Sequence, residues 1–104
     1  MRGDLYRLRV RKDAVGHEQR GARYAVVLQT EALNTSTLIV APTSTSARPG
    51  LLHPRLDMNG TPTVVLVEQM AAVDPERLGD SFGRVDPGEW DDVERAVKLV
   101  LGLL

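Results

Sequence analysis

Apolar and polar residues alternate near the start of the chain, over residues 5–11. A period of two is typical of a β-strand, because successive side chains of a strand point to opposite faces. Tyr6, Leu8 and Val10 would then share one face, while three arginines share the other. Such a basic face either follows the phosphates of a nucleic acid or remains in solvent and prevents association through the strand edge.

Three continuous apolar runs come later, and their β-branched residues predict buried strands. These runs cover residues 24–29, 37–41 and 63–67. We expect Pro42 to end the second strand and residues 70–73 to extend the third. A weaker strand over residues 51–56 contains a proline. It is predicted to lie at an edge of the sheet, because proline lacks the N–H that a central strand donates.

Turn and capping residues separate these strands. Asn59 and Gly60 form a dipeptide that is typical of a tight β-hairpin. Residues 74–79 begin with Asp-Pro and end with Gly, which predicts one helical turn with Asp74 as its N-cap and Gly79 as its terminator. A short last strand is expected over residues 82–85.

The end of the chain changes to a helical period. Asp86 and Pro87, followed by Glu89 at the third helical position, resemble a capping box at a helix start. Apolar residues then recur at helical spacing on one predicted face: Trp90, Val93, Val97, Val100 or Leu101, and Leu104. This amphipathic helix is expected to pack on the sheet and to contribute stability rather than chemistry.

The order of these elements predicts the fold class. Parallel strands need long crossover connections, and the connections here are too short for repeated βαβ units. We therefore expect one domain over residues 1–104, mainly β with a C-terminal helix, whose antiparallel sheet curls into a small barrel.

Composition excludes several kinds of site. The 104 residues include no cysteine, so disulfides and thiolate chemistry are excluded. His17 and His53 are too few for a typical zinc site, so we expect no metal. No apolar run reaches the length of a membrane span, and the first residues do not resemble a signal peptide. The predicted location is the cytoplasm, without a membrane partner.

Charge is distributed unevenly along the chain. Residues 1–23 carry seven arginines and lysines against three acids, whereas residues 57–104 carry ten acids against four basic residues. The basic end suits a polyanion and the acidic end would repel one. Charge alone favours two solvated faces.

Two polar segments remain as candidates for chemistry. One is the loop that contains Glu18, Gln19, Arg20 and Arg23, and the other is the hydroxyl run of residues 43–46. Both lie at the ends of apolar strands, where a small sheet can bring them together. An acid, an arginine and a hydroxyl suit cleavage of RNA, which supplies its own nucleophile in the 2′-OH. A generic binding loop remains the alternative.

Six segments, in the same order and with the same spacing, resemble the MazF/PemK toxin family. They are residues 2–6, 16–19, 23–28, 39–45, 64–69 and 73–78, and the closing helix through residue 103 is also similar. The resemblance implies an SH3-like barrel of the CcdB/PemK-like plasmid maintenance toxin fold, assembled as a homodimer. It also implies a sequence-specific endoribonuclease, or mRNA interferase, that needs no metal or cofactor.

In that family, cleavage of single-stranded RNA proceeds by 2′-OH attack and leaves a 2′,3′-cyclic phosphate and a 5′-OH. The family's catalytic arginine and hydroxyl correspond to Arg23 and Ser44, and Glu18 is the natural proton acceptor. The pair of Glu18 and Gln19 matches the family's Glu-Gln pair in the loop that borders the RNA groove. We predict RNA contacts from His17, Gln19, Arg20, Thr43, Thr45 and Gln69. The resemblance further implies a cognate, MazE-like antitoxin whose acidic segment covers the arginine-bearing groove.

Three residues depart from the family pattern. Tyr24 replaces a proline after the catalytic arginine, and Ser44 replaces a threonine, so Thr43 or Thr45 remains an alternative source of the hydroxyl. Ala71 stands where many members carry a basic residue. Two other functions stay open: a protein-binding toxin of the same shape that poisons gyrase, and a non-catalytic RNA-binding relic.

Overall fold

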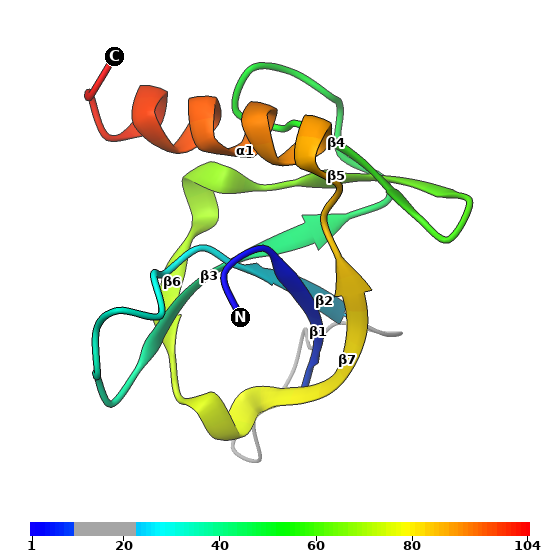
Figure 1. The fold of residues 1–104 in the computed structure, drawn as a ribbon. Helices are drawn as coiled ribbons and strands as arrows, with labels where there is room; N and C mark the ends of the chain where they lie inside the picture. Colours follow the sequence, from blue (N-terminus) through cyan, green and yellow to red (C-terminus); the bar gives the residue numbers. More distant parts are fainter. Residues whose placement is uncertain (10–22) are drawn as a thin grey trace, which may run out of the picture.

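The computed structural model describes residues 1–9 and 23–104 (Figure 1). Its strands are β1 (Asp4–Leu8), β2 (Arg23–Val27), β3 (Leu38–Ser44), β4 (Arg55–Met58), β5 (Thr61–Val65), β6 (Ala71–Val73) and β7 (Leu78–Arg84). Two short 3-10 turns, η1 (Val67–Gln69) and η2 (Pro75–Arg77), flank β6, and the helix α1 (Pro87–Val100) closes the described chain. No helix in this part of the chain is long and apolar enough to cross a membrane.

All strand pairs in the described sheet are antiparallel. The strand order is β4-β5-β3-β2-β1-β7, and β6 pairs with the first half of β3. The sheet therefore curls, and in Figure 1 the chain passes from β6 at the left, around the bottom, to β7 at the right. This arrangement, with one C-terminal helix, confirms the predicted fold class.

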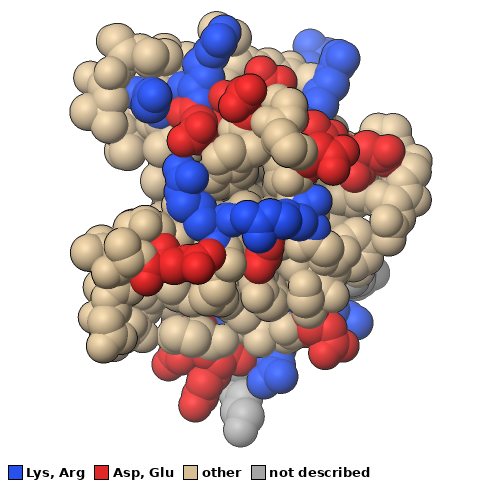
Figure 2. All heavy atoms as spheres, in the orientation of Figure 1, with Lys and Arg blue, Asp and Glu red and all other residues tan. Residues whose placement is uncertain are grey.

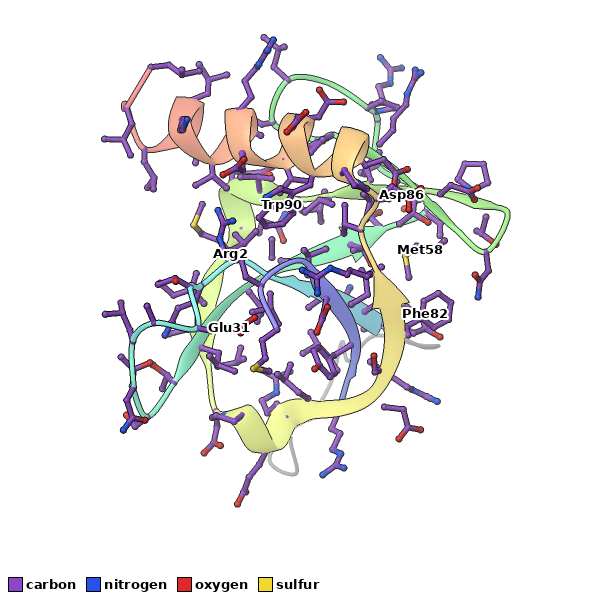
Figure 3. The ribbon with its side chains drawn as sticks, in the orientation of Figure 1. Arg2, Glu31, Met58, Phe82, Asp86 and Trp90 are labelled. Atoms are coloured by element: carbon purple, nitrogen blue, oxygen red, sulfur yellow. The ribbon has the colours of Figure 1, made fainter. Side chains whose placement is uncertain are left out.

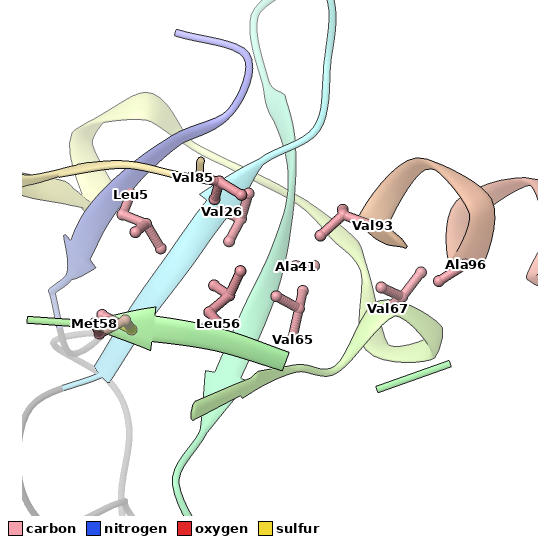
Figure 4. Close-up of a cluster of buried hydrophobic side chains, with 10 residues drawn as sticks. All are labelled: Leu5, Val26, Ala41, Leu56, Met58, Val65, Val67, Val85, Val93 and Ala96. Atoms are coloured by element: carbon pink, nitrogen blue, oxygen red, sulfur yellow. The ribbon is translucent and has the colours of Figure 1, made fainter. Parts of the chain in front are cut away.

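Side chains are buried on both faces of the central strands, which explains their continuous apolar runs. Val26 of β2 faces a cluster that β4, β5 and α1 cover, shown in Figure 4. Its neighbours Ala25 and Val27 face a second cluster inside the curl, with Val40 and Val73. Tyr6 and Leu8 pack together against this second cluster, as their alternation predicts; Val10 and Arg11 lie outside the described residues.

Pro42 does not end its strand, contrary to the prediction. β3 continues to Ser44 because one of its edges passes from β6, which pairs with Leu38–Val40, to β5, which pairs with Thr43 and Ser44, while β2 pairs with its other edge. The carbonyl oxygen of Pro42 accepts a hydrogen bond from the N–H of Leu66 at 2.8 Å. The N–H that Pro42 lacks would lie on this same edge, between the residues that pair with β6 and those that pair with β5.

Two other strand boundaries differ from the prediction. Residues 70–73 do not extend the preceding strand, because η1 turns the chain and β6 pairs with β3 instead. β7 begins at Leu78 and therefore includes Gly79, which was predicted to terminate a helical turn. A Cβ at Gly79 would lie 3.1 Å from the carbonyl oxygen of Arg7, so this glycine permits the close approach of β1 and β7.

Other local predictions are confirmed. Asn59 and Gly60 have φ angles of 53° and 88° and join β4 to β5 in a tight hairpin. β4 lies at the sheet edge, as predicted, but it covers Arg55–Met58 and not the predicted residues 51–56. Asp74 caps η2 by accepting a hydrogen bond from the N–H of Glu76 at 2.9 Å.

The helix α1 packs on the sheet through Val93 and Ala96, which are fully buried. The predicted capping box is wrong, because Glu89 accepts a hydrogen bond from the N–H of Asp57 at 2.8 Å and so joins the helix to β4. Trp90, Val97 and Val100 also pack against the first cluster, so Val100 rather than Leu101 continues the predicted face. Only Leu104 departs from the prediction, because it is 72% exposed.

The first residues tie β1 to the helix (Figure 3). Arg2 donates to Glu94 at 3.1 Å, and its guanidinium lies 4.6 Å from the centre of the Trp90 ring. The terminal amine contacts Glu31 at 2.6 Å, and Arg84 contacts Asp4 at 2.9 Å. Figure 2 shows basic and acidic side chains interspersed over this face, as these pairs require.

The buried face of β4 gives a test of the first cluster. Leu56 is 3% exposed within it, whereas Leu51 on the preceding loop is 75% exposed. Leu56→Ala should reduce the free energy of unfolding by about 2–5 kcal/mol, because it removes buried methyl groups and leaves a cavity. Leu51→Ala should change it by less than about 0.5 kcal/mol. Urea unfolding of both variants measures this, and equal effects would contradict the described core.

Candidate active site

A cleft of about 650 Å³ opens where β2 begins and β3 ends. Its polar lining comes from Arg23, Tyr24, Thr43, Ser44, Thr45, Ser46, Thr61, Thr63 and Gln69. Its apolar lining comes from Met58, Leu66 and Phe82. Figure 3 shows Met58 and Phe82 on the same side of the molecule, on β4 and β7. Arg23 is the one charged residue among the described residues of this lining, so the cleft suits an anion.

The register of β2 and β3 places Arg23 and Ser44 together. Ala25 pairs with Pro42, and Val27 pairs with Val40. Continuing this antiparallel register by two residues sets Arg23 directly opposite Ser44. Both residues are half-buried and both line the cleft. Two residues 21 positions apart in sequence are thus brought to one point by strand pairing.

The hydroxyl of Ser44 is held by the turn that follows it. Its oxygen accepts hydrogen bonds from the N–H groups of Ser46 at 3.1 Å and Ala47 at 3.0 Å. The hydroxyl of Ser46 lies 3.3 Å away. These contacts orient the Ser44 oxygen, and its own hydrogen remains able to bond an incoming acceptor.

The neighbouring hydroxyls differ from Ser44. Thr43 donates its hydroxyl hydrogen to the carbonyl oxygen of Tyr24 at 3.1 Å, a bond that joins β3 to β2. Thr45 is exposed at the rim of the cleft. The geometry therefore favours Ser44 over Thr43 as a hydrogen-bond donor to a ligand.

Tyr24 and Phe82 form an aromatic wall of the cleft. Their ring centres lie 4.7 Å apart with a tilt of 51°, and both pack against the first hydrophobic cluster. The Tyr24 ring thus packs against Phe82 in a position that the smaller proline of the family pattern would leave empty. Sequence reasoning missed Phe82 and Met58, because nothing in their local sequence separates a cleft residue from a core residue.

The structure brings together the predicted residues that it describes. Arg23, Thr43, Ser44, Thr45 and Gln69 all line the one cleft. The remaining predicted residues, His17, Glu18, Gln19 and Arg20, lie outside the described residues, so their positions in the site stay predictions.

A contact between His53 and Glu68 holds in place the turn η1 that carries Gln69. His53 Nε2 lies 2.7 Å from Glu68 Oε2, and His53 Nδ1 lies 2.9 Å from the carbonyl oxygen of Arg48. The Glu68 carboxylate, and then the Arg48 carbonyl, raise the pKa of His53 above its usual value. The same contact with His53 lowers the pKa of Glu68. The pair thus fixes the loop of residues 48–53 against η1.

Metal ligands do not gather in the described part of the chain, where no group of three His, Cys, Asp or Glu residues is placed to hold an ion. The chemistry that the described cleft offers is a guanidinium, an oriented hydroxyl and an aromatic wall.

Comparison with known proteins identifies relatives of this chain. A family model described as PemK-like, MazF-like toxin of type II toxin–antitoxin systems matches residues 1–101. A Mycobacterium tuberculosis protein named as a toxin, Rv3098A, is 40% identical over 104 residues, which cover 99% of this chain and 98% of that protein. Endoribonuclease EndoA of Bacillus subtilis is 29% identical, covering 99% of this chain and 95% of that enzyme.

A solved structure shows the same fold. The MazE-MazF complex of Deinococcus radiodurans contains a chain that is 26% identical, with a TM-score of 0.79 and coverage of 99% of this chain and 96% of that one. Together with the family match, this confirms the resemblance that the six sequence segments indicate.

The His53–Glu68 pair predicts a pH dependence of stability. Because the pKa of His53 is raised on folding, its contribution is complete at low pH and is lost as pH rises through the raised value. Because the pKa of Glu68 is lowered, its contribution is lost as pH falls through the lowered value. The pair should therefore contribute most to the free energy of unfolding between about pH 5 and 6.5.

His53→Gln should lower the free energy of unfolding at pH 5.5 by at most about 1 kcal/mol, because both side chains are partly exposed. The difference from the unsubstituted protein should shrink at pH 8.5. Urea unfolding at the two pH values measures this, with Glu68→Gln as the partner variant. A loss that is equal at both pH values would show that protonation of His53 plays no part.

Proposed function

Because this chain belongs to the PemK-like, MazF-like toxins of type II toxin–antitoxin systems, we propose that it cleaves single-stranded RNA at the Arg23–Ser44 cleft without a metal ion. The observation that carries the proposal is the placement of this arginine and this hydroxyl at one cleft by the β2–β3 register. The relative named an endoribonuclease supports RNA cleavage over gyrase poisoning.

In the proposed reaction, the ribose 2′-OH attacks the adjacent phosphorus. The bond from phosphorus to the 5′ oxygen breaks, which leaves a 2′,3′-cyclic phosphate on one product and a 5′-OH on the other. The proton of the 2′-OH passes to Glu18, the proposed acceptor. The departing 5′ oxygen takes a proton from solvent water, and Glu18 then releases its proton to solvent. Atoms and charge balance without a cofactor.

Arg23 and Ser44 stabilise the charge that develops on the phosphoryl oxygens. A guanidinium keeps its positive charge at all ordinary pH values and presents donors in a planar fork that fits a phosphate. The Ser44 hydroxyl adds a donor that its turn has already oriented. Donors fixed before the reaction need no reorganisation as the charge develops, which is why they lower the barrier.

The rest of the cleft provides contacts to bases. Thr43, Thr45 and Gln69 are the described residues that we assign to RNA binding. An exposed amide such as that of Gln69 reads base edges, and the aromatic wall offers a stacking surface. Proposed contacts from His17, Gln19 and Arg20 complete the assignment and give sequence preference.

Two partners belong to this proposal. The first is a cognate antitoxin of the MazE kind, because the similar Deinococcus radiodurans chain is in a complex with MazE. An acidic segment of this antitoxin would occupy the arginine-bearing cleft. The second is another copy of this chain, because the exposed leucines at and after the end of α1 offer an apolar surface for a homodimer. These leucines are Leu99, Leu101, Leu103 and Leu104. The reaction is placed in the cytoplasm, where its RNA substrate lies.

Removal of the guanidinium should abolish the activity. The purified protein should cut a long single-stranded RNA in the presence of EDTA, and Arg23→Ala should lower kcat by about 10²-fold or more. Arg23→Lys should recover only part of the loss, because an ammonium lacks the planar fork. Lys98→Ala, on the exposed side of α1, is the control and should cleave normally. Cleavage that EDTA stops, or that survives Arg23→Ala, would contradict the proposal.

The hydroxyl gives a second, independent test. Ser44→Ala should lower kcat about 10- to 1,000-fold, whereas Ser44→Thr should retain activity because it keeps a hydroxyl on the same carbon. Thr43→Val should reduce stability more than kcat, since the Thr43 hydroxyl bonds Tyr24. Single-turnover cleavage and thermal unfolding of each variant separate these effects. A larger kcat loss in Thr43→Val than in Ser44→Ala would reassign the donor.

A further inference from the structure

Two hollows continue the candidate cleft across the surface. The first, of about 580 Å³, shares Ser44 and Thr45 with the cleft. The second, of about 370 Å³, shares Pro49 and Arg55 with the first. Because each hollow shares lining residues with the next, we take the three as one groove that runs from Arg23, past the β4–β5 hairpin, to the middle of α1, which lies over these strands in Figure 1.

Strand pairing aligns two arginines along this groove. Arg55 of β4 pairs with Val64 of β5, and Val64 is also the partner of Ser44 on β3. The extended register adds Arg23 on β2 to the same row. Paired residues of neighbouring strands share a face, so the row lies on one side of the sheet. Three strand spacings separate Arg23 from Arg55, a distance of about 14 Å along the sheet.

The far end of the groove carries a second guanidinium. Arg95, from α1, lines the same hollow as Arg55. Among the described residues neither arginine forms an ion pair, although Asp92 also lines this hollow. Two like charges at one hollow repel each other, and a bound anion relieves that repulsion.

The middle of the groove has a different character. Ala47, Pro49 and Pro62 contribute apolar walls. Its two carboxylates are already bonded to the backbone: Asp57 accepts from the N–H of Gly60 at 2.7 Å, and Glu89 accepts from the N–H of Asp57 at 2.8 Å. This stretch suits an uncharged base or ribose, whereas both ends suit phosphates.

We propose that the groove holds a longer stretch of the single-stranded RNA substrate, with a phosphate away from the cleavage point bound by Arg55 and Arg95. The inference rests on the proposed function, because it takes the RNA to be anchored at Arg23. An RNA strand bound at Arg23 continues over the protein surface in both its 5′ and its 3′ direction. In one of these directions the groove provides a path that ends at Arg55 and Arg95.

The test compares long and short RNA. The short RNA is the minimal oligonucleotide that the unsubstituted protein still binds, and both RNAs carry 2′-O-methyl groups so that they stay intact. The double variant Arg55→Gln/Arg95→Gln should bind the long RNA about three- to tenfold more weakly at 0.15 M salt. Its salt dependence should be shallower by about 0.7 for each phosphate that the variant no longer binds. Binding of the short RNA should not change.

Lys98→Gln is the matched control, because it removes one cation from the same helix at a residue outside the groove lining. Thermal unfolding confirms that each variant is folded. An undiminished affinity for the long RNA, or an equal decrease for both RNAs, would overturn the inference. Weaker binding of an acidic antitoxin peptide, with RNA binding unchanged, would also overturn it. Failure of the proposed function is a separate result: unmodified RNA that binds the unsubstituted protein but is never cut in EDTA.

Discussion

The antiparallel pairing of β2 with β3 is the constraint on which the rest of this structure depends. Val26 pairs with Ala41, and both are fully buried in the cluster beneath α1. A slip of one residue would turn every side chain of the strand to the other face and would disrupt both hydrophobic clusters. Because burial fixes this register, it also fixes the two residues that continue it, Arg23 and Ser44. The apolar core and the candidate chemistry are therefore set by one alignment.

Local patterns predicted the elements whose causes are local. The hairpin follows from Asn59 and Gly60, which adopt the positive φ angles that this turn needs. The prediction at Pro42 was wrong because the effect of a proline depends on which strand faces its missing N–H, and one edge of β3 passes from β6 to β5 there. Glu89 fits the pattern of a helix cap, but β4 provides a backbone N–H that the helix sequence does not reveal.

The candidate site likewise contains residues that could be predicted from the sequence and residues that could not. Arg23 and Ser44 were found through resemblance to a family, and the strand register then explains their convergence. Phe82 and the brace between His53 and Glu68 were not predictable, because each depends on contacts between distant segments. The groove to Arg55 and Arg95 likewise exists only once β4, β5 and α1 are assembled. Glu18 stays a prediction from sequence.

The proposed cleavage site is tested most directly by a crystal structure of the protein with an RNA that carries a 2′-O-methyl group at its cleavage point. The phosphate next to this group should lie within about 3.2 Å of both an Arg23 nitrogen and the Ser44 hydroxyl oxygen. A cleavage-point phosphate that contacts neither side chain, or that lies on another face of the sheet, would contradict the proposed site.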